Sequence, residues 1–249
     1  MLGVWLRDRV RRRSKRSSYG RGRDQRPAYR PTLESLEDRT LLAAGALDAT
    51  FGIGGLVKTS FLYNVADAAT TGFHSLAVQA DGKIVVADVA NGPTPGFTVA
   101  RFNADGSADG TFGASGFAHV RFSPTSTDQA AAVAVEADGK IVVAGTTTDT
   151  SGNKNFGVTR FNPNGILDTT FGFNQNGLVV VDFTGPTTPT HVDSVLSSLL
   201  VEADGRIVLA GSATFNKGAN GPSGVPVVDF AVARLNNDGT QDADFAASS

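Results

Sequence analysis

A twelve-residue pattern occurs three times in this chain, and this repetition constrains the fold more than any other feature of the sequence. Arginine, asparagine, glycine, aspartate and phenylalanine stand at offsets 0, 2, 5, 8 and 11 of every copy. A second phenylalanine follows the arginine in the first two copies, and Leu235 replaces it in the third. The pattern begins at Arg101, Arg160 and Arg234, and residues 47–52 form a fourth, partial copy. Self-similarity of this kind indicates a repeat architecture, in which each unit buries its apolar surface against its neighbours.

Short apolar runs between the copies predict four β-strands in each unit. The dipeptide Asp-Gly separates two of these runs, which is a strong hairpin signal. The run that follows the dipeptide is continuously aliphatic, as in residues 141–144, and this predicts burial on both faces. The predicted strands are 55–61, 75–79, 84–87 and 97–102 in the first unit, 116–122, 132–136, 141–144 and 156–161 in the second, and 177–183, 198–202, 207–210 and 230–235 in the third.

Four short strands in each of several consecutive units predict an all-β fold. We expect a β-propeller-like array of four-stranded antiparallel blades, with three full repeats plus a stub. Propellers close a ring with about four blades or more. The array therefore predicts one of three situations: chains that self-associate, an open stack of repeats, or a fragment of a longer repeat protein.

Three motifs that recur in the same order resemble a known repeat family. They are Leu-Asp-x-Thr-Phe-Gly at residues 47–52, Arg-Phe-Asn-x-Asp-Gly-Ser at 101–107 and Ala-Asp-Gly-Lys-Ile-Val-Val-Ala-Gly at 137–145. Together they resemble the uncharacterized delta-60 repeat family, from Leu47 to the C-terminus. The resemblance implies a β-propeller-like fold in extracellular bacterial proteins whose biochemical role is open.

The first 43 residues differ from the rest of the chain. Residues 1–40 carry twelve Lys or Arg and five Asp or Glu, whereas the remaining chain carries ten and nineteen. Residues 33–42 follow the pattern Leu-Glu-x-Leu-Glu-x-Arg-x-Leu-Leu, which resembles an N-terminal motif of large exported bacterial proteins, although no apolar segment of about 7–15 residues follows the basic tract. The alternatives are a disordered basic tail or a start codon upstream of the true one.

These differences predict two parts of the chain. We expect residues 1–43 to be a disordered export or targeting segment. Residues 44–249 hold the repeats, which we place at about 47–107, 108–166, 167–240 and, in part, 241–249. The expected location is extracellular or on the cell surface.

Composition narrows the function classes. The chain has no cysteine, which excludes disulfides, thiolate catalysis and zinc–thiolate sites. The repeats are acidic and lack a basic stripe, so we do not expect nucleic acid as a partner. No apolar run approaches the roughly 18 residues that a membrane-spanning helix needs.

The three units differ chiefly in the connection between their third and fourth predicted strands. This connection covers residues 88–96, 145–155 and 211–229, or 9, 11 and 19 residues. The connection between the first and second strands also varies, and in an up-and-down blade both emerge on one face. Insertions of this kind often mark a binding face, although surface loops also tolerate them without a function. Our candidates on this face are Phe215, Asn216, Lys217, Asn220, Lys154 and His191.

Two other features suggest chemistry. The Arg–Asp pair recurs in every unit at a separation of eight residues, which favours a structural role over a ligand site. We expect no cofactor, and the alternative is calcium at the Asp-rich loop 103–109, although alanines occupy the positions where an EF-hand needs Gly and Glu. Asp and Asn before Gly are ordinary turn formers.

The sequence therefore predicts an exported, non-enzymatic repeat module that acts in binding or in cell-surface structure. Its partner would be an extracellular ligand, a glycan or a protein. The alternatives are a propeller-scaffold enzyme acting on extracellular polysaccharide, with polar groups from the variable loops, and a non-functional fragment of a longer repeat protein.

Overall fold

The computed structural model describes residues 45–58, 75–90, 95–183, 193–216 and 226–245, and these form part of one compact unit. Residues 1–44, which include the predicted export segment, lie outside the described residues. Within the described ranges the regular structure is entirely β-strand. No helix in them is long and apolar enough to cross a membrane.

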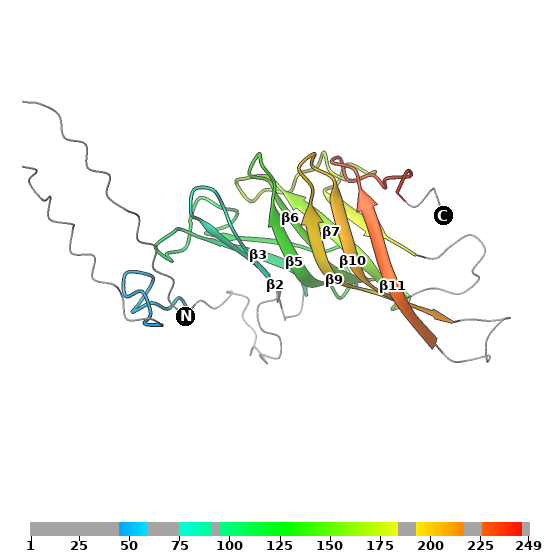
Figure 1. Ribbon diagram of the computed structural model, residues 1–249, viewed down its shortest axis with the longest axis horizontal. Helices are drawn as coiled ribbons and strands as arrows, with labels where there is room; N and C mark the ends of the chain where they lie inside the picture. The colour runs from blue at the N-terminus through cyan, green and yellow to red at the C-terminus, as the bar shows by residue number, and fades with distance from the viewer. Residues whose placement is uncertain (1–44, 59–74, 91–94, 184–192, 217–225, 246–249) are drawn as a thin grey trace, which may run out of the picture. The chain divides into compact units, whose positions relative to one another are not determined.

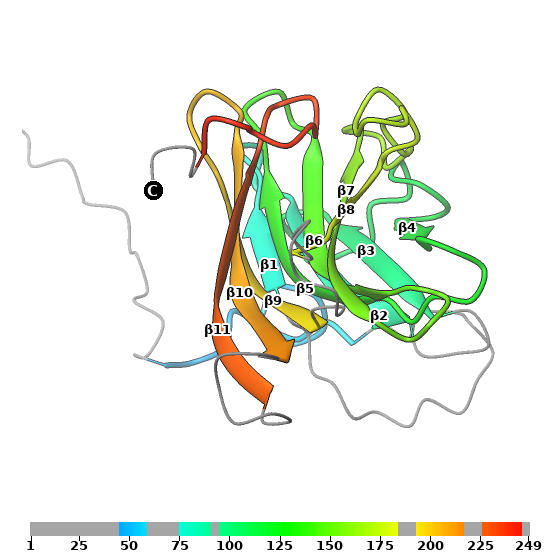
Figure 2. The same cartoon turned by 90° about the vertical axis from the view of Figure 1, so that its right-hand side faces the viewer.

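Eleven described strands form three antiparallel sheets, and each sheet follows chain order. In Figures 1 and 2 the sheets stand beside one another as blades, and β5 packs against both β1 and β9. The first blade contains β1 (Ser75–Val78), β2 (Ile84–Ala90), β3 (Gly96–Phe102) and β4 (Phe117–Val120); the second β5 (Gln129–Val135), β6 (Ile141–Thr148), β7 (Lys154–Phe161) and β8 (Leu178–Val181); the third β9 (Asp193–Val201), β10 (Ile207–Asn216) and β11 (Pro226–Leu235). The predicted all-β, propeller-like fold is confirmed.

The blades are offset from the sequence repeats. The outer strand β4 of the first blade comes from the second repeat, so the prediction that the four strands of one repeat form one sheet is wrong. Two hydrogen bonds explain the offset: Arg101 N donates to Gly116 O (3.0 Å), and Asp109 N donates to Arg101 O (2.9 Å). They hold the linker against the end of β3, so the chain returns beside the strand it has just left.

The first predicted strand, residues 55–61, is not a β-strand in the part of it that the structure describes, residues 55–58. Gly55 lies in a turn, Leu56 forms isolated bridges with Gly52 and Ile53, and residues 59–61 lie outside the described part of the chain. The third blade likewise has three strands among the described residues.

The variable connections are shorter than the sequence suggests because the strands continue into them. The hairpin strands have seven residues each in β2 and β3, eight in β6 and β7, and ten in β10 and β11. The connecting loops are therefore 91–95, 149–153 and 217–225. Pairs such as Thr148 with Lys154 extend the ladder. Threonine favours strands although it is polar, so the apolar pattern ends before the strand does.

Two apolar clusters lie between consecutive blades. One joins the first blade to the second and contains Phe97, Phe112 and Phe161; the other joins the second to the third and contains Phe156 and Phe171. All five rings are at most 2% exposed. Burying each such side chain stabilises the fold by about 2–3 kcal/mol. The core is thus a series of interfaces between blades.

A β-bulge in the inner strand recurs in the second and third blades. The register shifts next to Gly145 in β6 and Gly211 in β10. A Cβ atom on Gly145 would lie 2.0 Å from Gln129 O, and one on Gly211 would lie 2.1 Å from Val195 O. Backbone approaches of this closeness require glycine.

We expect Gly145→Ala to lower the free energy of unfolding by about 2–4 kcal/mol, because the backbone of β5 must move away from the new methyl group. Gly110→Ala is the control, since its Cβ would have no atom within 4 Å and its φ is ordinary. Urea unfolding followed by circular dichroism measures both. Equal stabilities for the two variants would contradict the bulge account.

Candidate functional site

The repeated arginine joins each blade to the next one. Arg160, at the end of β7, is 3% exposed. Its Nε donates to Asp168 Oδ2 at 2.8 Å, and its Nη1 donates to Asn237 O of the third blade at 2.6 Å. Its guanidinium also lies 4.5 Å from the centre of the Phe171 ring. One side chain therefore makes an ion pair within its own blade, a hydrogen bond to the next blade and a cation–π contact.

Arg101 repeats this arrangement between the first and second blades. It donates to Asp109 Oδ2 at 2.8 Å and to Pro163 O at 2.5 Å, and it lies 4.6 Å from the Phe112 ring centre. We call the Arg, Asp and Phe of one pattern, together with the Asn-x-x-Gly turn of the next, the interblade clamp.

The phenylalanine and the glycine of the clamp also meet across the blades. A Cβ on Gly165 would lie 2.9 Å from the Phe112 ring, so only glycine allows the ring to reach its place. The backbone adds a bond at the same position: Gly113 N donates to Asn164 O at 2.8 Å. Gly172 N and Asp238 O form the same bond in the second clamp, at 2.7 Å.

Each clamp aspartate has several donors. Asp168 Oδ1 accepts from the backbone and hydroxyl of Thr170, while Oδ2 faces Arg160 and, at 3.6 Å, Lys140 from the Asp-Gly turn. Burial acts to raise the pKa of Asp168, but the bonds from Thr170 and the charge of Arg160 outweigh it and hold that pKa below its ordinary value. The hydrogen bond from Thr111 similarly lowers the pKa of Asp109 well below its usual range. The geometry agrees with the structural interpretation of the repeated pair.

The described candidate ligand residues, Lys154, Phe215 and Asn216, lie at the opposite end of the blades. We call the end that carries the β2–β3, β6–β7 and β10–β11 hairpins the hairpin end, and the end with the Asp-Gly turns and the linkers the clamp end. Lys154 is exposed at the start of β7, while Phe215 and Asn216 belong to β10 rather than to a loop. Lys217, Asn220 and His191 lie outside the described residues. In Figure 2 the β10–β11 hairpin extends toward the bottom of the view.

Polar bonds join the second and third blades at the hairpin end. Lys154 N donates to Asp193 Oδ1 at 2.8 Å, and Leu196 N donates to Thr146 Oγ1 at 3.1 Å. The loop 149–153 is closed by Asp149, whose carboxylate accepts from Ser151 N and from the backbone and side chain of Asn153. Hydrogen bonds within the loop and to the third blade therefore fix the backbone at the hairpin end of the second blade, and with it the position of Lys154.

A buried carboxylate nearby was missed by sequence reasoning. Asp128 is fully buried before β5, where it accepts from Phe122 N, Ser126 Oγ and Thr147 Oγ1 at 2.6–3.0 Å. Two of the donors belong to the connection between β4 and β5 and the third to β6, so Asp128 holds the connection between the first and second blades against β6. Only the Ser-x-Asp spacing of residues 126–128 hints at this turn in the sequence.

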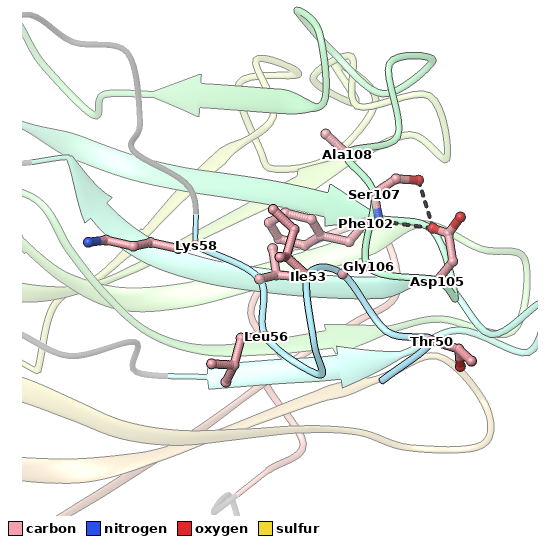
Figure 3. Close-up of a pocket in the computed structure, with 11 residues that line it drawn as sticks. Thr50, Ile53, Leu56, Lys58, Phe102, Asp105, Gly106, Ser107 and Ala108 are labelled. Carbon is pink, nitrogen blue, oxygen red and sulfur yellow. Dashed lines mark hydrogen bonds between the residues drawn. The ribbon is translucent and has the colours of Figure 1, made fainter. Parts of the chain in front are cut away.

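A groove of about 440 Å³ lies beside the partial copy of the pattern. Figure 3 shows Ile53 and Leu56 on one side and Phe102 and the Asp105–Ala108 turn on the other. Gly52 N donates to Asp105 O at 2.7 Å, so the partial copy docks on the first blade as the complete copies dock on theirs.

The loop proposed for calcium uses its carboxylates internally. Asp105 Oδ1 accepts from the backbone and the hydroxyl of Ser107, and Asp109 belongs to the first clamp. Among the residues that the structure describes, no group of three or more His, Asp or Glu side chains could hold a metal ion.

Comparison with known proteins agrees with this architecture. Residues 79–112, 136–171 and 202–245 match the family described as "Domain of unknown function (DUF5122) beta-propeller". Each matched segment contains the Asp-Gly turn, the two central strands of a blade and the Arg–Asp–Phe pattern. No curated protein matches the chain. Together, the match and the three sheets identify a β-propeller-type repeat protein.

We expect Arg160→Met to lower the free energy of unfolding by about 3 kcal/mol or more, because it breaks a buried ion pair and leaves Asn237 O without its donor. Arg206→Met is the control, since the Arg206 side chain is 39% exposed and pairs with Glu202 and Asp204 at the surface and, at 3.8 Å, with Asp242. Urea unfolding should show a midpoint close to the unmutated value for the control. An equally small effect at Arg160 would contradict the clamp.

Acid should destabilise the protein. Asp109 and Asp168 have lower pKa values folded than unfolded, so their contribution is complete above the unfolded pKa of about 4 and is lost as the pH falls through the folded values. Glu136 acts in the opposite direction, because burial raises its pKa. Urea titrations should give a constant stability between about pH 7 and 5 and a decline below about pH 4, which Asp168→Asn should reduce. Constant stability down to about pH 3 would contradict this assignment.

Proposed function

We propose that this chain is an exported, non-enzymatic binding module of the delta-60 repeat type, with its ligand contacting the hairpin end. The contrast between the two ends of the blades carries the proposal. At the clamp end, the repeated charged side chains form bonds within and between blades. At the hairpin end, the strands lengthen from seven to eight to ten residues along the three blades.

A constant clamp end and a variable hairpin end together fit a scaffold that carries a binding surface at one end. Binding residues are commonly placed on variable loops that a rigid framework holds in position. Lys154 fits this role, because it is exposed while its backbone is bonded to Asp193 of the neighbouring blade. The proposed ligand class is an extracellular polysaccharide, whose hydroxyl groups and carboxylates a lysine and exposed hairpin backbones can bind.

Export rests on the sequence of the first 43 residues. A basic tract precedes the Leu-Glu-x-Leu-Glu-x-Arg-x-Leu-Leu motif at residues 33–42, and the resemblance to exported bacterial proteins supports an extracellular or cell-surface location. The absence of cysteine is compatible with that compartment.

Affinity gel electrophoresis tests the binding function. Xylan, laminarin and alginate are cast separately into native gels, and we expect at least one of them to retard the protein. Lys154→Ala should weaken that retardation roughly three- to tenfold, as expected for one exposed contact, whereas Arg206→Ala at the clamp end should not. A loss of the same size in both variants, or no retardation by any polymer, would contradict the proposal. Shortening of a polymer during incubation would favour the enzyme alternative.

A further inference from the structure

The third blade exposes a face that the other two blades bury. Phe230 of β11 is 98% exposed, whereas Phe97 of β3 and Phe156 of β7, which hold the same position in their blades, are both 0% exposed. Val232 repeats the contrast: it is 48% exposed, and its counterparts Val99 and Val158 are fully buried. The same phenylalanine and valine therefore occur in all three blades, but they are buried only in the first and the second.

Two neighbours cover these positions in the first and second blades. A phenylalanine two residues after the outer strand packs edge-to-face on each ring: Phe122 on Phe97 at 5.1 Å between centroids, and Phe183 on Phe156 at 5.0 Å. The inner strand of the next blade packs on the same face, since β5 contacts β3 and β9 contacts β7. The third blade would need an outer strand with a phenylalanine and the inner strand of a following blade.

The first blade exposes the complementary surface. Leu76 and Val78 of β1 are 65% and 63% exposed. Val133 and Val135, which hold these positions in β5, join the apolar cluster against the first blade, and Leu199 and Val201 of β9 join the cluster against the second. The inner strand β1 thus carries the surface that β5 and β9 use to cover the blade before them.

The partial copy of the pattern adds a charged complement. Asp48 Oδ1 accepts from Thr50, as the clamp aspartates accept from their threonines. In the three complete copies the second carboxylate oxygen accepts from an arginine Nε. Among the described residues no cation pairs with Asp48 Oδ2. An arginine from a preceding blade would complete this clamp beside the groove in Figure 3.

We propose that a second copy of this chain covers both surfaces, with the third blade of one copy packed against the first blade of the other. The contact repeats the interface that the chain already forms twice, between its first and second and between its second and third blades. Two chains joined at both ends give six blades, within the range of about four to eight that closes a propeller ring. The two joints are then identical and related by a two-fold axis.

The two half-patterns explain how the copies meet. Residues 47–52, Leu-Asp-Ala-Thr-Phe-Gly, correspond to residues 241–246, Gln-Asp-Ala-Asp-Phe-Ala. Gly52 has φ +56° and a Cβ there would lie 2.3 Å from Leu56 O, so this position requires glycine. In the joint, Arg234 exchanges Asp242 for Asp48 of the second copy.

Light scattering on a sizing column tests the assembly with the full 249-residue chain. The expected mass is twice the 25.8 kDa of one chain, and it should not rise further with concentration. Phe230→Asp should give a folded monomer, with a dissociation constant raised roughly a hundredfold or more by the loss of a buried ring in both joints. Phe173→Asp is the control, because Phe173 is 88% exposed but belongs to the linker between β7 and β8 rather than to β1 or β11, and its variant should remain a dimer.

A mixing experiment tests the head-to-tail arrangement. Leu76→Asp and Phe230→Asp each disable one side of the joint, so each variant alone should be monomeric. Their mixture retains one intact joint and should form a heterodimer, detectable with a tag on one variant. A dimer formed by the Leu76→Asp chain alone would overturn the arrangement, because it would show a joint that does not use β1.

Three other outcomes would also overturn the proposal. A monomeric unmutated chain would show that a second copy does not cover these faces. A mass that climbs with concentration would show an open filament rather than a closed ring. Equal dissociation of the Phe173→Asp and Phe230→Asp dimers would show that the third-blade face has no special role. Circular dichroism of each variant separates dissociation from unfolding.

Discussion

The buried arginine of the interblade clamp is the interaction on which the structure depends. A single blade of four short strands cannot bury both of its faces, so the blades must be held against each other. Arg101 and Arg160 do this by pairing with an aspartate of their own blade while donating to a backbone carbonyl of the next. Because the acceptor is backbone, the bond tolerates proline at position 163 and asparagine at 237.

The two ends of the blades differ in how much their sequence can vary. The clamp end has to keep the same residues in every copy, since each of its charged groups completes a bond network between blades. The hairpin end has no such requirement, and there the strands lengthen and the connections change. The bonds that hold the blades together therefore gather at one end and the variable connections at the other, as in scaffolds where a rigid framework carries variable loops. The clamp also explains the family match, whose segments end at its phenylalanines.

Much of the fold could be predicted from the sequence, because local signals were strong. The Asp-Gly turns and aliphatic runs placed the central strands of all three blades correctly. The offset between repeat and blade could not be predicted. The first strand of a repeat could pair with its own repeat or with the one before it, and the repeated sequence is the same in both cases. The polar strand ends after Ala144 were missed because threonine breaks the apolar pattern. Asp128 and Asp193 were missed because each accepts from a residue of another strand, Thr147 and Lys154 respectively. The exposure of Phe230 depends on which blade follows it.

Native-state hydrogen exchange at the amide of Gly172 tests the central claim most directly. This amide belongs to the linker of the second blade and donates to Asp238 O of the third, so it exchanges only when the two blades separate. If the clamp makes consecutive blades one cooperative unit, the amide should be protected as strongly as amides in the buried strand β6, through global unfolding alone. Exchange as fast as in the hairpin loop 149–153 would contradict the account, because it would show blades that part while each remains folded.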